Sequence, residues 1–260
     1  MQTVASRIDL APREIRFYES EGYLVVPGFV SPDAVEQLYD ETMQVMESCL
    51  GLGAHDLSRA KGTADKLRQC GQYLAGSALD RLINGESSLH LASQLVKGEA
   101  RVYMPFTAVK VAGGGGRFHM HQDNSYTRHE PGVGSLNIWV ALVDMAPEHG
   151  CLAVVPRSHR GGQLESHNAG DGDSHQEVDY DPDLVFPVRM RAGDAIAFSR
   201  WTVHGSGANT TDRPRVAYAL QYHRTDVKYL DKLSGEWKLL VDHPRWATTP
   251  VEELTSMVKS

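Results

Sequence analysis

The chain has 260 residues, of which 41% are hydrophobic and 23% are charged, a composition typical of a soluble globular protein. This length suffices for one well-buried domain or two small ones. The formal net charge of −7 argues against nucleic acid or an anionic membrane as the main partner, because both attract clustered Lys and Arg. No apolar run approaches the length of a membrane span, so we expect no membrane partner.

The three cysteines are Cys49, Cys70 and Cys151. They are widely spaced and form neither a CxxC pair nor a disulfide framework, which is typical of a reducing compartment. We expect them to be small buried hydrophobic residues. No apolar leader follows Met1, so a cytoplasmic location is predicted.

The first third of the chain shows helical patterns. Residues 12–22 predict a helix that ends at a glycine. A short apolar strand follows within 23–30, and residues 31–50 predict a second helix that begins at Ser-Pro. Weaker helical signals lie within 64–70 and 88–96.

From about residue 100 the pattern changes to short β-rich runs separated by Gly, Pro, Asn and Asp turns. These runs are residues 101–111, 135–145, 151–156, 184–190, 194–199 and 215–224. Many short strands in series are typical of a sandwich or barrel. The sequence therefore predicts a mainly β protein with flanking helices packed on it.

Three connecting or terminal segments carry their own signals. Residues 112–118, A-G-G-G-G-R-F, predict a flexible hairpin turn. Residues 159–183 are polar and rich in turn residues, and a loop of that length is usually a lid or disordered. Thr249 and Glu252 fit a capping box, which predicts a last surface helix.

Residues 119–123, H-M-H-Q-D, place three side chains able to bind a metal at a spacing of two. On an extended strand His119, His121 and Asp123 would share one face. The sequence lacks HExxH and Cys-rich zinc signatures. With the distant His204, the pair His121 and Asp123 would make a facial triad, which leaves open positions on Fe(II) for a chelating cosubstrate and dioxygen.

Arg215 begins the β-rich run 215–224. On a strand it shares a face with Ala217, Ala219 and Gln221. The small alanines leave room beside the guanidinium, which favours bidentate binding of a carboxylate.

These motifs together resemble the phytanoyl-CoA dioxygenase (PhyH-like) family of Fe(II)/2-oxoglutarate oxygenases, over most of the chain. The resemblance rests on four segments: FYESEGYLVVPGFVSPDAVEQL, HQD, IWVALVDMAPEHGCLAVVPRSH and GDAIAFSRWTVHGSGANTTDRPRVAYALQY. It implies a double-stranded β-helix, or jelly roll, with helices buttressing one sheet. It further implies a single domain over 1–260, with its core at about 100–225 and a lid at about 159–183.

The resemblance also implies roles for individual residues. His121, Asp123 and His204 match the iron ligands and hence the catalytic centre, and Arg215 matches the residue that holds the distal carboxylate of 2-oxoglutarate. Positions that line the cosubstrate or metal pocket match Gln122, Trp139 and Ser206. Looser matches for the substrate pocket are Tyr103 and Lys110, and Asn137 shares a strand face with Trp139. His119 is left over, and we expect it behind the ligands or at the pocket wall.

The family implies Fe(II), 2-oxoglutarate and O2 as the reacting partners, with release of succinate and CO2. Halogenating relatives replace the ligand carboxylate by a small residue, so the presence of Asp123 disfavours halogenation. Hydroxylation of a small-molecule metabolite or natural-product intermediate is the default expectation. Desaturation, epimerisation or cyclisation remains open to the same chemistry, and we expect a monomer or small homo-oligomer.

Two alternatives differ in class. A cupin-type metal dioxygenase would need no 2-oxoglutarate, but its Glu should fall near Ser125 and Tyr126, and its PxG is replaced by the S-R-W of 199–201. A catalytically silent jelly-roll protein that only binds or regulates would not need the intact set of ligands and Arg215.

Overall fold

We describe the protein from a computed structural model, in residues 3–50, 67–68, 70–114, 116–170, 175–242 and 250–255. The four helices among these residues are α1 (Pro12–Glu21), α2 (Pro32–Leu50), α4 (Ala78–Ile83) and α5 (Glu86–Val96). The helices predicted within 12–22, 31–50 and 88–96 are therefore confirmed.

Gly22 shows why α1 ends where the sequence predicts. Its φ of +83° is left-handed, and its N–H donates to the carbonyl of Tyr18. A Cβ at this position would lie 2.4 Å from Nδ1 of His159, so glycine is required by both the backbone and the packing.

The major sheet has the strand order β1-β11-β6-β13-β3-β2 among the described residues. Its strands are β1 (Tyr23–Val26), β2 (Leu67–Arg68), β3 (Ala100–Lys110), β6 (Ser135–Ala141), β11 (Ala195–Ser199) and β13 (Arg215–Arg224). The pairings are antiparallel throughout.

A second sheet has the order β10-β7-β12-β4. It consists of β4 (Phe118–His121), β7 (Leu152–Val154), β10 (Phe186–Pro187) and β12 (His204–Ser206). Smaller pairings join β5 (His129–Glu130), β14 (Lys228–Leu230) and β15 (Trp237–Leu239), and separately β8 (Ser166–Asn168) and β9 (Gln176–Val178).

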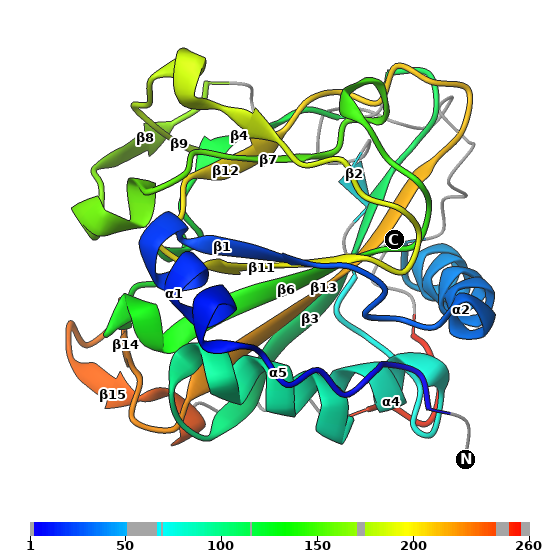
Figure 1. Cartoon of the computed structure of the whole chain (residues 1–260), viewed down its shortest axis with the longest axis horizontal. Coiled ribbons are helices and arrows are strands. Elements are labelled where there is room, and N and C mark those ends of the chain that lie inside the picture. Colours follow the sequence, from blue (N-terminus) through cyan, green and yellow to red (C-terminus); the bar gives the residue numbers. More distant parts are fainter. Residues whose placement is uncertain are drawn as a thin grey trace.

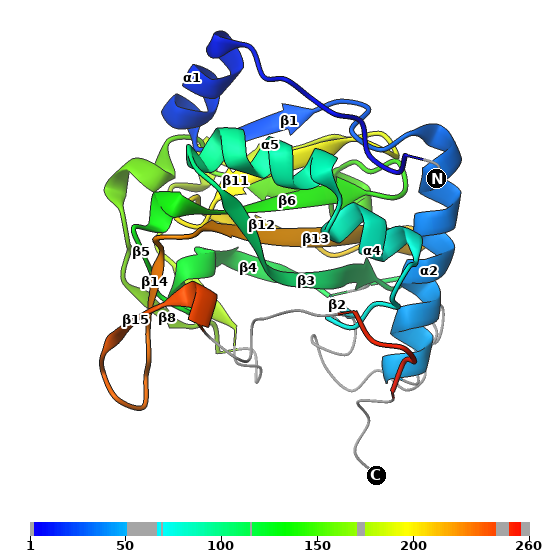
Figure 2. The same ribbon diagram turned by 90° about the horizontal axis from the view of Figure 1, so that it is seen from below.

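Figure 1 shows the two main sheets as facing layers, with α4 and α5 on the outer side of the major sheet. Turned by 90°, Figure 2 shows α5 and α4 lying across that sheet, with α2 at its edge. The fold is a double-stranded β-helix, or jelly roll, with flanking helices. The predicted fold class is thus confirmed.

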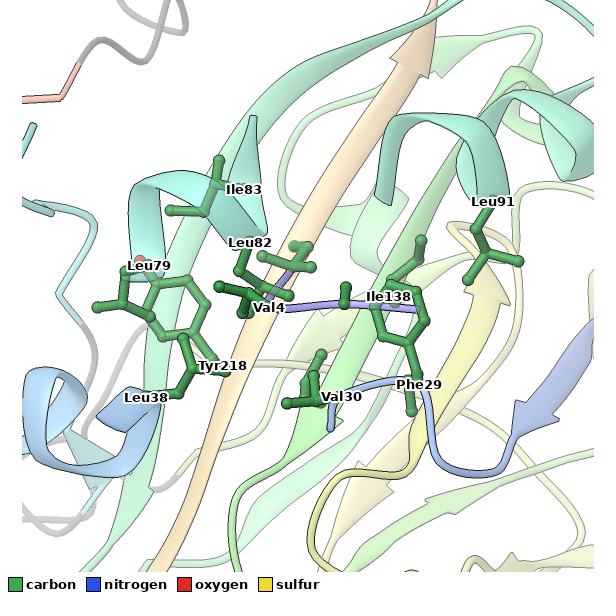
Figure 3. Close-up of a cluster of buried hydrophobic side chains, with 14 of the residues drawn as sticks. Val4, Phe29, Val30, Leu38, Leu79, Leu82, Ile83, Leu91, Ile138 and Tyr218 are labelled. Atoms are coloured by element: carbon green, nitrogen blue, oxygen red, sulfur yellow. The ribbon is translucent and has the colours of Figure 1, made fainter. Parts of the chain in front are cut away.

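Alternation along β13 separates two cores. Val216, Tyr218 and Leu220 point into the cluster beneath the helices, whereas Ala217 and Ala219 point between the sheets, as the two-residue period of a strand requires. Figure 3 shows the cluster beneath the helices, where Leu79, Leu82 and Ile83 of α4 and Leu91 of α5 meet side chains of the sheet, Tyr218 among them. The helices therefore bury one face of the major sheet and leave the other to the site.

Three local predictions are wrong. Leu67 and Arg68, within the weak helical signal at 64–70, form β2 against β3, because the edge of the major sheet supplies pairing that overrides propensity. Residues 112–118 join β3 of one sheet to β4 of the other and therefore cannot form a hairpin. Residues 250–255 contain no helix, since Val251 pairs with Leu74, while Thr249 lies outside the described residues.

The long loop 159–183 is built of short elements where it is described. A 3₁₀ turn, η4 (Ser158–Gly161), precedes the β8–β9 hairpin, and η5 (Pro182–Leu184) follows it. The remaining 3₁₀ turns are η1 (Asp123–Ser125), η2 (Gly132–Gly134), η3 (Pro147–His149) and η6 (Leu240–Asp242).

All three cysteines are buried and none forms a disulfide, as the sequence predicts. Among the helices that the structure describes, none has the length and apolarity needed to cross a bilayer.

Truncation of the core beneath the helices should be costly. Leu82 is fully buried, and Leu82→Ala should lower the free energy of unfolding by about 2–5 kcal/mol, since it removes buried methyl groups and leaves a cavity. Urea unfolding followed by circular dichroism measures this. Leu184, which is 57% exposed, is the matched control: Leu184→Ala should stay within about 0.5 kcal/mol. Equal effects of the two substitutions would contradict the assigned core.

Candidate active site

A β-bulge brings the two candidate histidine ligands side by side. β12 pairs with β4 so that His204 lies opposite His121 and Ser206 opposite Phe118. The two-residue interval from His204 to Ser206 on β12 therefore lies opposite the three-residue interval from His121 to Phe118 on β4. The extra residue on β4 interrupts the alternation of its side chains between the two faces. Phe118 and His121, rather than His119 and His121, line the cavity.

Hydrogen bonds to backbone carbonyls fix the orientation of both imidazoles. Nδ1 of His121 lies 2.7 Å from the carbonyl oxygen of His119, and Nδ1 of His204 lies 2.9 Å from that of Thr202. A carbonyl only accepts, so each Nδ1 carries a proton, and Nε2 is the ring nitrogen left to bind a metal once it is deprotonated. This is the usual arrangement of metal-binding histidine.

Asp123 completes the group at the start of η1. Its Oδ1 lies 3.8 Å from Nε2 of His121 and 3.6 Å from Nε2 of His204. One potential ligand atom from each residue lies within 4.8 Å of the other two. Two neutral imidazoles and a carboxylate converging in this way fit a divalent first-row metal such as iron.

The surroundings of His204 and Asp123 favour the protonation states in which these two groups bind a metal. Burial, followed by the neighbouring His121, lowers the pKa of His204 to about 4. Burial alone would raise the pKa of Asp123, but His204, a hydrogen bond with His121 and the charge of Arg200 together lower it below its usual range. At neutral pH the imidazole of His204 is therefore neutral and Asp123 is a carboxylate.

Arg200 holds the loop that carries Asp123. Its Nη2 donates to the carbonyls of Asp123 and Thr127, at 2.9 and 3.1 Å, and its Nη1 donates to Oε1 of Gln221 at 3.2 Å. The amide of Gln221 in turn reaches Oδ2 of Asp123 at 3.5 Å. This buried network places the carboxylate between the two histidines.

The far end of the cavity is cationic. The guanidinium of Arg215 lies over the ring of Trp139, 5.0 Å from its centroid, and donates to the carbonyls of Gly150 and Ala108, both at 3.1 Å. Its Nε is buried without a hydrogen-bond partner. Arg215 is paired in register with Lys110 on β3.

Lys110 is fully buried, and its ammonium donates to Oγ of Ser206 at 2.7 Å and to the carbonyl of Gly207. Burial, followed by the charge of Arg215, lowers the pKa of Lys110 well below its ordinary value. Burial likewise lowers the pKa of Arg215 to about 9. Two cations buried side by side are poised to receive an anion.

A cavity of about 750 Å³ joins the two ends. At its cationic end lie Ala108, Trp139, Leu152, Ser206 and Arg215. Its other lining residues, which include the candidate metal ligands, are Cys70, Gly71, Tyr103, Met104, Phe106, Phe118, His121, Asp123, Tyr126, Thr127, Asn137, His175, Phe198, Arg200, His204, Gly205 and Gln221.

Most residues that the sequence singles out meet at this cavity, with three exceptions. The side chain of Gln122 does not line it; its amide bonds Gly162, Leu164 and Trp201 and anchors the long loop. Gln122 therefore does not take the expected place in the lining of the cosubstrate or metal pocket. It lies between His121 and Asp123, whose side chains both face the cavity, so its own side chain points the other way.

The other two exceptions are Lys110 and His119. Lys110 lies beside Ser206 at the cationic end rather than in the substrate pocket, to which its looser match had assigned it. His119 is turned out of the cavity by the bulge, and its Nδ1 lies 3.5 Å from Oε2 of Glu177 on β9.

Several lining residues escaped the sequence reasoning. Arg200 had no motif of its own, and Phe118 lines the cavity only because of the bulge. His175 comes from the loop 159–183, which carries no site motif; the ring of His175 lies 4.7 Å from that of Phe118. The spacing of β-rich runs gives no signal for these three contacts.

The fold and the site together define the class of 2-oxoglutarate-dependent non-haem iron oxygenases. The model of the phytanoyl-CoA dioxygenase (PhyH) family matches residues 18–217, and the chain belongs to this family. The family named from the sequence motifs is thus confirmed.

Curated relatives agree. A phytanoyl-CoA dioxygenase of Arabidopsis thaliana is 27% identical over 255 residues, which cover 84% of this chain and 90% of that protein. An L-proline trans-4-hydroxylase of Streptomyces griseoviridis is 31% identical over 166 residues, or 55% of this chain and 62% of the hydroxylase.

Solved structures share the fold. The epimerase SnoN in complex with Fe3+, alpha ketoglutarate and nogalamycin RO matches with a TM-score of 0.68 and 25% identity, over 95% of each chain. EvdO2 of Micromonospora carbonacea var. aurantiaca, complexed with 2-oxoglutarate, matches with a TM-score of 0.69 and 22% identity, over 94% of this chain and all of that one.

The choice between the histidines of β4 is open to a direct test. His121→Ala should lose tight binding of Fe(II), because it removes a converging ligand, whereas His119→Ala should retain it, since its ring lies outside the cavity. Anaerobic Fe(II) titration of the two variants and the unmodified protein measures this. Equal loss of iron in both variants would show that the assignment is wrong.

The network around Asp123 should tune metal affinity. Gln221→Leu keeps the volume but removes the contacts to Asp123 and Arg200, and should weaken Fe(II) binding by about 10–100-fold, as for other partners of metal ligands. Gln94→Leu is the control and should leave the iron affinity unchanged, because that glutamine bonds the backbone of Ile8 and Leu10, away from the cavity. Unchanged iron affinity in a folded Gln221→Leu protein would remove this role from Gln221.

Proposed function

We propose that this protein is an Fe(II)/2-oxoglutarate-dependent dioxygenase that oxidises, by hydroxylation, a small-molecule metabolite or natural-product intermediate and releases succinate and CO2. One observation carries the proposal. The converging set His121, Asp123 and His204 shares a cavity with Arg215, whose Nε is buried there without a partner.

In this proposal Nε2 of His121, Nε2 of His204 and the carboxylate of Asp123 hold Fe(II). Bound iron and 2-oxoglutarate supply the oxidising chemistry with O2. The protein keeps the proton of each imidazole on Nδ1 through the carbonyls of His119 and Thr202, so that Nε2 stays available to the metal.

Arg215 binds the distal carboxylate of 2-oxoglutarate. The free Nε–H supplies a charge-assisted hydrogen bond, and the hydroxyl of Ser206 and the ammonium of Lys110 lie at the same end of the cavity. An arriving carboxylate would offset the two buried cations, whose pKa values burial now depresses. Trp139 lies beneath the guanidinium and fixes its plane.

The loop 159–183 acts as a lid in this proposal. β9 lies next to β4 and brings His175 to the cavity, while the N–H of Gln176 donates to the hydroxyl of Tyr126 at 3.1 Å. A covered cavity excludes water from the reacting groups. We propose that residues 1–260 act as one oxygenase domain, with this lid on a core of about 100–225.

Hydroxylation is favoured over halogenation because Asp123 supplies a carboxylate where a halide would need an open position. The similarity to an L-proline trans-4-hydroxylase supports it. Related folds also include the epimerase SnoN and the carbocyclase SnoK, so epimerisation or cyclisation of the substrate would use the same ligands. The free Nε of Arg215 argues against a cupin-type enzyme without 2-oxoglutarate.

The proposed partners are the cosubstrate and a small molecule, with neither nucleic acid nor a membrane, and the acting unit is a monomer or small homo-oligomer. The net charge of −7 supports the first part. Three buried cysteines without a disulfide support a reducing compartment such as the cytoplasm.

Anaerobic addition of Fe(II) and 2-oxoglutarate should produce the visible charge-transfer band of the chelate. Arg215→Ala should raise the concentration of 2-oxoglutarate needed for half of that band by at least about tenfold, because it removes a charged hydrogen-bond donor. Arg213→Ala is the matched control, since Arg213 is exposed just outside β13.

Absence of the band in the unmodified protein would overturn the proposed function. A band that forms equally well in Arg215→Ala would contradict the role of Arg215. Iron binding without a band would favour the cupin-type alternative, and no metal binding would favour a silent jelly-roll protein.

A further inference from the structure

The inner face of the major sheet forms one wall of the cavity, here called the floor, and Asn137 lies on it in β6. β11, β6 and β13 place Phe198, Asn137 and Gln221 opposite one another in register, and all three line the cavity. Trp139 lies two residues further along β6 on the same face, at the cosubstrate end. Asn137 therefore belongs to the part of the floor that the cosubstrate leaves open.

Among the described lining residues, two have a buried side-chain polar atom without a hydrogen-bond partner: Arg215 through its Nε and Asn137 through its Oδ1. The first is a donor at the cosubstrate end. The second is an acceptor near the metal, on a side chain that is only 3% exposed. A buried acceptor without a partner costs free energy until a donor reaches it.

The neighbouring polar groups are already engaged with one another. Of the five N–H groups of a guanidinium, Arg200 uses four, on Asn124, Gln221 and the carbonyls of Asp123 and Thr127. The hydroxyl of Tyr103 bonds the side chain of Thr127. None of these contacts reaches Oδ1 of Asn137.

Rings and apolar groups make up much of the remaining wall. Phe106, Phe118, Tyr126 and Met104 line it, and His175 adds a further ring from the lid. The rings of Phe118 and Tyr126 flank His121, with centroids 4.6 and 5.4 Å from its own. Such a wall favours a ring-containing ligand, which gains from offset or edge contacts with aromatic side chains.

The hydrogen-bonding groups of the cavity wall also indicate the charge of the ligand. An anion would need a nearby cation with free donors, but four of the five N–H groups of Arg200 are already bonded. The cations Arg215 and Lys110 lie at the other end of the cavity. A neutral group that donates a hydrogen bond satisfies the open acceptor without a charge to compensate.

We propose that Asn137 is a specificity-determining residue that accepts a hydrogen bond from a hydroxyl of a neutral, ring-containing substrate. This inference rests on the proposed function, because the cosubstrate must occupy the cationic end. The bond to Asn137 would anchor the substrate on the floor of the cavity, below the metal ligands.

Four two-ring probes separate the possibilities: naphthalene, 2-naphthol, 2-methoxynaphthalene and 2-naphthoate. Their binding would be measured by equilibrium dialysis at pH 7 against protein loaded anaerobically with Fe(II) and 2-oxoglutarate. 2-Naphthol should bind about three- to tenfold more tightly than naphthalene and 2-methoxynaphthalene, because it alone is a neutral donor. 2-Naphthoate should bind more weakly than 2-naphthol.

Asn137→Leu, which keeps the volume, and Asn137→Ala should abolish the preference for 2-naphthol. Asn168→Ala, at an exposed asparagine of β8 outside the cavity, should preserve it. The charge-transfer band recorded in the same samples shows that each variant is folded and loaded.

Tightest binding of 2-naphthoate would overturn the neutral substrate class. Tightest binding of 2-methoxynaphthalene would overturn the acceptor role of Asn137, and so would a preference for 2-naphthol that persists in both Asn137 variants. No binding of any probe to protein that shows the band would overturn the ring-binding wall while leaving the proposed function standing. No band at all would overturn the proposed function itself.

Discussion

The pairing of β12 with β4 is the constraint on which the site depends. Opposite residues on antiparallel strands are held within a few ångströms of each other, so the register His204–His121 places two imidazoles at ligand distance before any metal arrives. Both rings are then held by backbone carbonyls two residues earlier in the chain, those of His119 in β4 and Thr202 just before β12. A slip of one residue would turn one imidazole out of the cavity.

The second constraint is the burial of positive charge. Arg200, Lys110 and Arg215 are each at most 3% exposed, while Asp123 is the one buried carboxylate among the described residues. Buried ions are tolerated when neighbouring dipoles or counter-ions compensate them. The charge of Arg200 is compensated by the carboxylate of Asp123 and by backbone carbonyls. Arg215 has only two carbonyls as acceptors, and its Nε–H has no hydrogen-bond partner. The uncompensated positive charge therefore lies at one end of the cavity, where a dianion such as 2-oxoglutarate would offset it.

Much of this molecule could be predicted from its sequence. The strand-rich core follows from short β runs, and Gly22 marks the end of α1. His121, Asp123, His204 and Arg215 stand out through motifs, because the chemistry restricts the residue types at those positions. Such positions can be identified in the sequence even though the segments that carry them are far apart in the chain.

The remainder depends on tertiary geometry that no local pattern encodes. Strict alternation would have turned His119 toward the cavity, but a bulge in β4 turned Phe118 there instead. The side-chain amide of Gln122 bonds backbone groups of the loop 159–183, and no spacing in the sequence indicates these contacts. Residues 67–68 form a strand rather than a helix because they pair with β3 at the edge of the major sheet.

The cavity divides its tasks between backbone and side chains. The two candidate histidine ligands are oriented by the main-chain carbonyls of His119 and Thr202, which are present whatever side chains surround them. The proposed substrate end of the cavity is instead formed by side chains of the major sheet, such as Phe106 and Asn137, and by His175 from the loop 159–183. Substitutions there leave the register of β4 and β12 intact. In the proposed function, this separation lets the histidine pair keep its geometry while the side chains of the sheet face and of the loop 159–183 select the substrate.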